Sequence, residues 1–552
     1  MRKSLLSLIV AGILVLSGCA QIPSDSLVQV GSAITSTNST DYTYYSPNGP
    51  TKGDGQTEIL NGFLNAFTGP QDDYAVAREY LTNSLATKWN PTGRLLIETS
   101  RPNITYVGTD QAKVVVNAAA AIDAEGRYQK FSMPQSLTYE YRFTKENGAW
   151  RISQAPDATI LVRPVFDVLF KSYNLYFYDQ QSRYLIPDMR WFPTRPSTGT
   201  RLVAALLAGP SDWLAKTAHN TFPNGTKLSL ESVPISDGTA VVDLTAEASK
   251  ATTDQLQHML AQLNATLTQV NSVYGTVIRV EHVPQSIADL PYRLALSPNN
   301  VPYMLKHDGL SALLGSNPVA AISPQLKTFA ATDFAVNNQA TQVALVGASG
   351  LAIGKNYAGS TQLRVIDTRP GLLRPAIDPQ GFTFALGAGR SSTLKAYNVS
   401  GRQVLTYSGW LAKHDHVAFS ISREGSRIAV LVRDGAQTQL FVAGIIRDYQ
   451  GVPIGIGEPI TLLSSNISSA NFGWIGEDAL GVITEVDGLI ATPTVVTVGG
   501  DVENLPPITG AVEIVAPAAG STYYVLDTHG IVWQLRGYTW QQVKTEVLRL
   551  HF

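Results

Sequence analysis

The stretch Ile421-Ser422-Arg423-Glu424-Gly425, followed by Ile428-Ala429-Val430-Leu431, carries the pattern that decides the fold of the C-terminal region. A strand end leads into a polar turn that finishes with glycine, and an apolar strand containing alanine follows. The same pattern occurs at Ile377-Asp378-Pro379-Gln380-Gly381 before Phe384-Ala385-Leu386. The two copies are separated by about the length of one propeller blade, roughly 40–50 residues.

A looser third copy and a late hairpin extend this β-rich region. Phe472-Gly473-Trp474-Ile475-Gly476 precedes Ala479-Leu480-Gly481-Val482, and Asp527-Thr528-His529-Gly530 separates two strand-like runs. Helical periodicity disappears from about residue 290, and the remaining length suits roughly six blades. We therefore predict an all-β propeller over residues 287–552, in which ring closure removes exposed sheet edges. A β-sandwich is the alternative.

A second unit, predicted over residues 161–286, mixes helical and strand-like patterns. A short helix over residues 200–207 ends at Gly209-Pro210, and Asp237-Gly238 provides a tight turn between strands. Thr253 can cap a long helix. The apolar face of that helix comprises Leu256, Leu260, Leu263, Leu267 and Val270. These signals predict a small α+β domain.

Aromatic side chains are concentrated at the start of this second unit. Packing in the core and between domains explains such a group, and a protein-recognition surface, where tyrosine and tryptophan are enriched, is the alternative. We favour packing. The group comprises Tyr173, Tyr176, Tyr178, Tyr184, Trp191 and Phe192.

The preceding unit, predicted over residues 56–160, has helices first and antiparallel strands after them. Asp72 and Asp73 can cap its second helix, and Asn147-Gly148 makes a hairpin turn. This order predicts an α+β cone similar to the NTF2 and cystatin group. Such cones often hold a pocket, but no inward carboxylate or histidine pattern is visible here, which favours a packed core.

The first residues predict export and membrane attachment. Met1-Arg2-Lys3 is positively charged, and an apolar run of signal-peptide length follows it. Ser17 and Gly18 are small, and they precede Cys19, the only cysteine in the chain. This arrangement is typical of a bacterial lipobox, in which the thiol takes a diacylglycerol before cleavage. A buried core thiol is the alternative.

We therefore predict a lipoprotein signal peptide over residues 1–18, cleaved between Gly18 and Cys19. Cys19 would carry an S-diacylglycerol and an N-acyl chain, which would hold the protein on the extracytoplasmic face of the cell membrane. Residues 19–55 are rich in Ser, Thr, Asn, Asp and Gly and lack apolar periodicity. We interpret them as a flexible tether.

The composition excludes some classes of function. Charged residues make up only 15% and the formal net charge is -2, which argues against nucleic-acid binding because phosphate contacts need clustered Lys and Arg. His414-Asp415-His416 could place two imidazoles on one strand face, but no third ligand with metal-site spacing is evident. We predict no catalytic residue, no cofactor and no metal site.

The order of the domains and several local motifs resemble the LpqB family of actinobacterial lipoproteins. The first domain contributes Gly62-Phe63-Leu64 and Trp89-Asn90-Pro91. The second contributes Leu206-Leu207-Ala208-Gly209-Pro210 and Phe222-Pro223-Asn224-Gly225-Thr226, and it resembles a GerMN (sporulation and germination) domain. The middle domain is the most specific part of this resemblance.

The resemblance implies a non-catalytic accessory lipoprotein rather than an enzyme. Family members are thought to contact the extracellular part of the sensor kinase MtrB of the MtrAB two-component system, and so to serve cell-envelope homeostasis and division. Only Cys19 transfers as a functional residue. The alternative is a propeller enzyme or carbohydrate-binding lipoprotein acting on envelope glycans, which clustered carboxylates at the channel mouth would favour.

Overall fold

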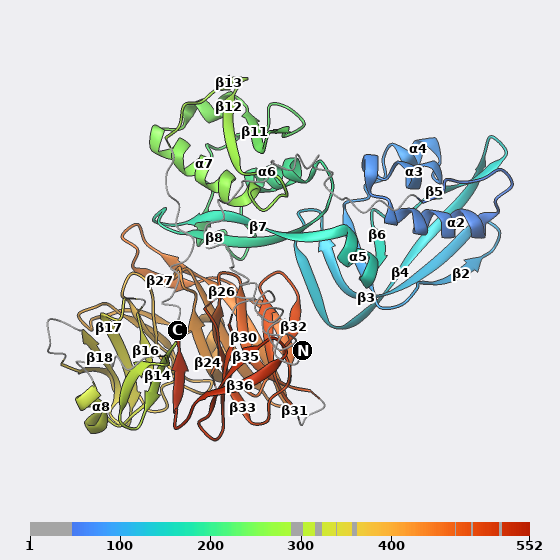
Figure 1. Ribbon diagram of the computed structural model, residues 1–552. Coiled ribbons are helices and arrows are strands. Elements are labelled where there is room, and N and C mark those ends of the chain that lie inside the picture. The colour runs from blue at the N-terminus through green and yellow to red at the C-terminus, as the bar shows by residue number, and fades with distance from the viewer. Residues whose placement is uncertain are drawn as a thin grey trace, which may run out of the picture. The chain divides into compact units, whose positions relative to one another are not determined.

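A computed structural model describes residues 47–288, 302–314, 323–337, 339–355, 362–469, 471–486, 490–517 and 522–552 (Figure 1). Gly18, Cys19 and most of the predicted tether lie outside these residues. The described residues fall within one unit, Thr43–Phe552. None of the helices they form combines the length and the apolar character needed to cross a membrane.

The N-terminal domain has helices followed by a sheet with the strand order β5-β4-β3-β1-β6, and β2 also pairs with β3. All pairs are antiparallel except β1 with β6. The helical segments are α2 (Gln56–Asn65), η1 (Ala66–Thr68), η2 (Gln71–Asp73), α3 (Ala75–Glu79), α4 (Asn83–Ala86) and α5 (Arg163–Leu169). The strands are β1 (Arg94–Glu98), β2 (Asn103–Val107), β3 (Gln111–Asp123), β4 (Tyr128–Glu146), β5 (Ala149–Gln154) and β6 (Thr159–Val162).

Helices and sheet of this domain share an aromatic core, in which the ring of Phe63 lies 4.9 Å from Phe67 and 5.1 Å from Trp89. Asn147 and Gly148 both have positive φ, as a two-residue hairpin turn between β4 and β5 requires. The α+β composition agrees with the sequence prediction. A relationship to the NTF2 and cystatin group stays a prediction.

The predicted capping role of Asp72 and Asp73 is wrong. Both residues have positive φ (46° and 55°) around the turn η2, and the N-cap of α3 is Tyr74, without a side-chain capping bond. The carboxylate of Asp73 instead pairs with the guanidinium of Arg78. The chain enters α3 through a left-handed turn that places Tyr74 at the N-cap. Asp73 therefore lies one position before the N-cap and cannot take the capping role.

The second domain packs two helices against two small sheets. Leu202, Leu206, Leu263 and Leu267 are fully buried in its core. The elements are β7 (Phe170–Asp179), β8 (Leu185–Pro193), α6 (Thr198–Ala208), β9 (Ala218–His219), β10 (Ile235–Ser236), β11 (Thr239–Leu244), η3 (Ala246–Lys250), α7 (Thr253–Leu267), β12 (Gly275–Val280) and β13 (Val283–Pro284).

The boundaries of these helices follow local signals. Gly209 ends α6, as predicted, and its φ is positive. The long helix is capped by Thr252 rather than by Thr253. The hydroxyl of Thr252 accepts from the Gln255 N–H (3.2 Å), and the Gln255 side chain accepts from the Thr252 N–H (2.9 Å). The reciprocal capping box needs a glutamine three residues after the cap, which only Thr252 has.

The C-terminal region is a propeller-like domain of six sheets in the part of the chain described (Figure 1). The sheets are β15-β14-β37, β16-β17-β18-β19, β20-β21-β22-β23, β24-β25-β26-β27 with β28 on β26, β29-β30-β31-β32 and β33-β34-β35-β36. The bounds of the first seven elements are β14 (Tyr303–Lys306), β15 (Gly309–Ala312), α8 (Ser323–Phe329), β16 (Ala331–Val336), β17 (Gln342–Gly347), β18 (Gly350–Lys355) and β19 (Arg364–Asp367).

The remaining strands complete these sheets. They are β20 (Ala376–Ile377), β21 (Thr383–Ala385), β22 (Leu394–Tyr397), β23 (Gln403–Tyr407), β24 (His416–Ile421), β25 (Arg427–Asp434), β26 (Gln437–Arg447), β27 (Pro453–Ile456), β28 (Ile460–Ser465), β29 (Gly473–Ile475), β30 (Ala479–Val486), β31 (Ile490–Thr497), β32 (Val502–Asn504), β33 (Ala511–Val515), β34 (Tyr524–Asp527), β35 (Val532–Arg536), β36 (Thr539–Lys544) and β37 (Arg549–His551). A 3-10 turn, η4 (Gly409–Lys413), precedes β24.

One edge strand of each sheet contacts the edge strand of the next, from β16 through β20, β24, β29 and β33 to β37, and β37 contacts β16. Strands from the two ends of the domain also pair, because β37 is hydrogen-bonded to β14. The repeated turns of the sequence lie at one equivalent place. Gly381, Gly425 and Gly476 have positive φ between the first and second strands of successive sheets. Six sheets do not fit the β-sandwich alternative.

Candidate functional site

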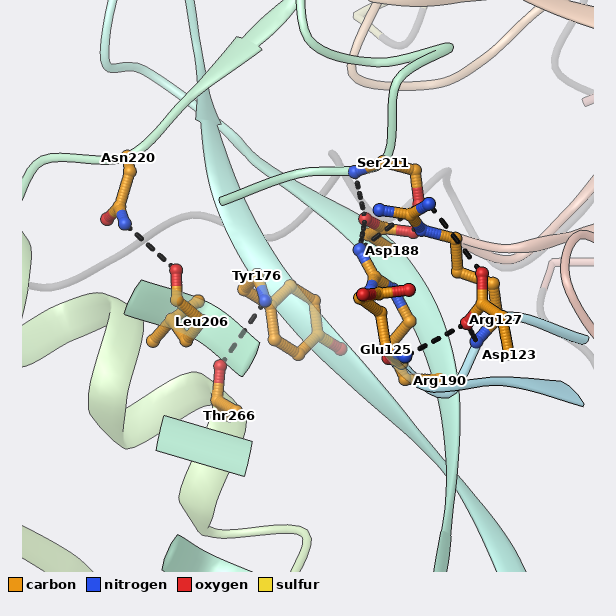
Figure 2. Close-up of polar contacts among 10 residues, drawn as sticks. All are labelled: Asp123, Glu125, Arg127, Tyr176, Asp188, Arg190, Leu206, Ser211, Asn220 and Thr266. Carbon is orange, nitrogen blue, oxygen red and sulfur yellow. Dashed lines mark hydrogen bonds and ion pairs between the residues drawn. The ribbon is translucent and has the colours of Figure 1, made fainter. Parts of the chain in front are cut away.

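A short buried piece of β8, residues 188–191, contacts all three domains, and we call it the junction segment. Asp188 and Arg190 are 4% and 1% exposed. Arg190 Nη2 donates to Asp188 Oδ2 (2.7 Å) and to Ser211 Oγ (3.1 Å). Ser211 in turn donates to Asp188 through its N–H (2.7 Å) and its hydroxyl (2.8 Å), as Figure 2 shows. The buried charges are therefore paired and hydrogen-bonded, which makes their burial tolerable.

The same arginine reaches the N-terminal domain. Arg190 Nη1 donates to the carbonyl of Glu125 (3.0 Å), and the Trp191 N–H donates to the carbonyl of Gly126 (2.7 Å). Asp123 shapes the loop that presents these carbonyls, because its Oδ1 accepts from the Arg127 N–H at 2.8 Å (Figure 2). Gly126 has φ 83°, and a Cβ there would lie 2.9 Å from the Trp191 carbonyl. Only glycine allows this close approach.

Trp191 connects the junction segment to the propeller-like domain. Its Nε1 donates to the carbonyl of Gly499 (2.9 Å), in the turn between β31 and β32. Its ring packs 5.1 Å from Phe166 and 5.6 Å from Tyr128. Close by, Arg163 pairs with Asp501 at 2.6 Å, and the hydrogen bond that Arg163 donates to this carboxylate raises the pKa of Arg163. One strand segment therefore joins three domains.

Strand β7 adds further contacts to the propeller-like domain. Asn174 Nδ2 donates to Asp478 (2.8 Å), and the Tyr176 hydroxyl donates to Glu477 (3.1 Å). Burial raises the pKa of Glu477, although the Tyr176 hydrogen bond opposes this shift. The Tyr176 N–H is also held, by Thr266 Oγ1 of α7 at 3.3 Å (Figure 2).

The aromatic group at the start of the second domain is buried throughout. Its tyrosines and Trp191 serve the domain core and the contacts between domains, as we favoured from the sequence. They do not form an exposed recognition surface.

The propeller-like domain contains a cavity of about 130 Å³ at the ends of its first strands. Charged groups in and around it are mostly paired. Asp378 binds Arg447 at 2.6 Å, Asp333 binds Arg374 at 2.6 Å, and Glu513 also binds Arg374. The carboxylates of this region are therefore neutralised by arginines. This arrangement differs from the clustered free carboxylates that the glycan-enzyme alternative calls for.

The two histidines weighed as metal ligands have separate environments. His414 Nδ1 lies 2.5 Å from Asp434 Oδ2, before β24 begins, whereas His416 is buried with Nε2 2.9 Å from the Leu411 carbonyl. Burial lowers the pKa of His416. Among the described residues, no group of three or more His, Cys, Asp or Glu is placed to hold a metal ion.

Three family models match consecutive parts of the chain. Residues 49–167 match the N-terminal domain of lipoprotein LpqB, residues 174–286 match the sporulation and spore germination domain, and residues 309–548 match the LpqB β-propeller domain. The chain belongs to the LpqB family.

Individual relatives agree with this assignment. Lipoprotein LpqB of Cutibacterium acnes is 23% identical over 600 residues, covering 98% of each chain. Lipoprotein LpqB of Thermobifida fusca is 30% identical over 280 residues, covering 48% of this chain and 44% of the relative. Among solved structures, the first GerMN domain of GerM from Bacillus subtilis is 22% identical and covers 22% of this chain and 96% of its own, with a TM-score of 0.19. A TM-score this low does not define a fold by itself.

The LpqB motif in the second domain lies beside the junction segment. Gly209-Pro210 ends α6, and Ser211 follows directly to hold Asp188 and Arg190. Sequence reasoning recognised the motif but missed these two charged residues. Their only local signal is a pair of charges, two positions apart, in the otherwise apolar strand β8.

Sequence reasoning also missed a buried carboxylate in the N-terminal domain of this LpqB-family protein. Glu98 ends β1 and is 5% exposed, and its Oε2 has no hydrogen-bond partner among the described residues. Burial raises the pKa of Glu98 to about 7, against a smaller opposing effect of Arg101. β1 lies between β3 and β6 and is buried along most of its length. The strand therefore lacks the alternation of apolar and polar residues that would show which way Glu98 points.

We expect Arg190→Met to disrupt the junction segment. The change leaves Asp188 buried without its counter-charge and removes the donor to Glu125, so it should cost about 3–5 kcal/mol of stability. Hydrogen exchange in the whole protein should then speed up in β8 and in residues 123–127. Arg183→Met, an exposed arginine before β8, is the matched control. Equal exchange in both variants would contradict the proposed role of Arg190.

We expect Glu98→Gln to stabilise the N-terminal domain at pH 8. The pKa of Glu98 in the folded protein (about 7) exceeds its ordinary value of 4.5, so the folded form binds an extra proton between these pH values. Stability therefore falls as pH rises from about 4.5 to about 7 and stays low above that range.

The neutral amide of the Glu98→Gln variant removes this loss of folding stability. The loss is about 1–2 kcal/mol once partial solvation of the carboxylate is allowed for. Exchange of the β1 amides at pH 5 and pH 8 measures the effect. Glu140→Gln, on the exposed part of β4, provides the control. An unchanged pH dependence in Glu98→Gln would refute the assignment.

Proposed function

We propose that this protein is a membrane-anchored, extracytoplasmic accessory lipoprotein. It binds and modulates the sensor kinase of an MtrAB-type two-component system in cell-envelope homeostasis and division. The observation that carries the proposal is the match of residues 49–167 and 309–548 to LpqB family models, with a sporulation and spore germination domain matched between them. The partner follows from the family resemblance, which implies the extracellular domain of an MtrB-like kinase.

Anchoring through Cys19 is part of the proposal. Cleavage after Gly18 would leave Cys19 with two acyl chains on its thiol and a third on its amine, and two chains already suffice for stable attachment. The tether over residues 19–55 would separate the folded domains (56–160, 161–286 and 287–552) from the membrane. Confinement beside the kinase raises the effective concentration, so that weak contacts suffice.

Exposed tyrosines support a place for the kinase on the propeller-like domain. Tyr449 and Tyr538 are 88% and 91% exposed, in the turns β26–β27 and β35–β36. Both turns join the third and fourth strands of their sheets, as does the turn of Gly499 that receives Trp191. Since neighbouring strands are antiparallel, these turns lie at one end of the sheets. We propose that the two tyrosines contact the kinase, because tyrosine is enriched in interfaces.

Modulation requires unequal binding to the signalling states of the kinase. The junction segment supports this role, because it couples the domains and lets a contact at one domain constrain the others. We propose no catalytic step. The glycan-directed alternative finds no support in the paired carboxylates around the cavity.

Direct binding to the kinase tests this function. We expect the purified protein to bind the immobilised extracellular domain of the MtrB-like kinase in biolayer interferometry. Replacing Tyr449 and Tyr538 together by Ser should weaken binding roughly tenfold, about 1.4 kcal/mol. Tyr274→Ser, 82% exposed in the second domain, is the matched control. Absence of binding, together with normal kinase output after deletion of the protein, would contradict the proposal.

Lipid attachment at Cys19 has its own test. Cells grown with an alkyne-tagged fatty acid should label the native protein and leave Cys19→Ser unlabelled, because serine cannot form the thioether. Ser24→Ala, in the tether close to the lipobox, should be labelled like the native protein. Labelling of Cys19→Ser would rule out this anchor.

A further inference from the structure

The cavity of the propeller-like domain has polar and aromatic walls from several sheets. Arg374 and Arg423 are the arginines among its lining residues, and Phe419, Phe472, Trp474 and Phe552 supply aromatic walls. The volume of about 130 Å³ is close to that of an engineered cavity of about 150 Å³ that admits benzene. The space therefore suits a small ring or a short apolar chain.

The two arginines differ in their partners. Arg374 is held by two carboxylates, of Asp333 and Glu513. Arg423 donates instead to backbone carbonyls, those of Pro517, Ala516 (2.7 Å) and Trp474 (3.0 Å). Carbonyl groups orient a guanidinium without neutralising it. Among the described residues, the hydrogen bonds of Arg423 therefore bring no counter-charge, although the carboxylates of Glu424 and Glu477 lie close enough to act on it electrostatically.

Arg423 also keeps donors free for a ligand. A guanidinium has five N–H groups, and the three carbonyls use three of them. Among the hydrogen bonds of the described residues, the Nε–H and one Nη1–H of Arg423 have no acceptor. Burial lowers the pKa of Arg423 to about 10, so the group is still charged at neutral pH. A partly buried positive charge beside a cavity with polar and aromatic walls is incompletely solvated, and an anion with an apolar body would relieve this cost.

We propose that this cavity binds a carboxylate group carried on an apolar body of about the size of a benzene ring. Arg423 supplies the counter-charge, and the aromatic walls cover the apolar part. The carboxylate could belong to a free small molecule or to the end of a peptide. The inference concerns the propeller-like domain and does not depend on the identity of the kinase partner.

The test follows the indole N–H signal of Trp474 in the full-length folded protein by ¹⁵N-TROSY NMR, with Trp474→Phe to assign it. The probes are benzoate and N-acetyl-glycyl-phenylalanine, each compared with its uncharged amide. We expect the carboxylates to shift the signal with affinities roughly tenfold higher than those of the amides, and to weaken as salt increases. Binding of benzoate alone would identify a free small molecule, and binding of the peptide alone would identify a peptide end.

Two variants test the charge of Arg423 and the volume of the cavity separately. Arg423→Gln should lower benzoate affinity roughly tenfold, whereas Arg433→Gln, an exposed arginine of β25, should leave it unchanged. Ser420→Phe, which fills the cavity from β24 and keeps Arg423, should abolish the shift. Equal affinity for carboxylates and amides in the native protein, or no shift with either carboxylate, would overturn the proposal even if Arg423→Gln fails to fold.

Discussion

The ion pair between Asp188 and Arg190 is the interaction on which the connection of the domains depends. Removing two charges from water is expensive, and their attraction offsets the cost only when further hydrogen bonds satisfy both groups. Here Ser211 donates two hydrogen bonds to the Asp188 carboxylate. The Glu125 carbonyl accepts one hydrogen bond from the Arg190 guanidinium. Since Ser211 and Glu125 belong to different domains, the pair makes these hydrogen bonds only when those domains are correctly joined.

The neighbouring residue extends this dependence to the propeller-like domain. Trp191 can reach the Gly499 carbonyl because the strand that buries Arg190 also fixes the position of its neighbour. Tyr176 and Asn174, on the strand paired with β8, contact the same sheet through Glu477 and Asp478. Contacts of this kind connect the three domains, so that a binding event at one domain can constrain the others.

Much of the fold was predictable because its signals are local. Gly425 and Gly381 mark turns that need positive φ, and Gly209 ends a helix for the same reason. The same local reasoning failed at Asp72, where the chain takes a left-handed turn. The junction segment, Glu98 and the cavity were not predictable, because their partners are far away in the sequence. Arg190 is an ordinary charged residue until Glu125 and Ser211 surround it.

We propose that the anchored protein changes the signalling of a sensor kinase. The most direct measurement is the autophosphorylation rate of the MtrB-like kinase in liposomes, with the lipidated protein added on the side of its extracellular domain. We expect a saturable change in that rate, with a weaker effect from the same protein without its lipid. An unchanged rate across all concentrations of the lipidated protein would contradict it.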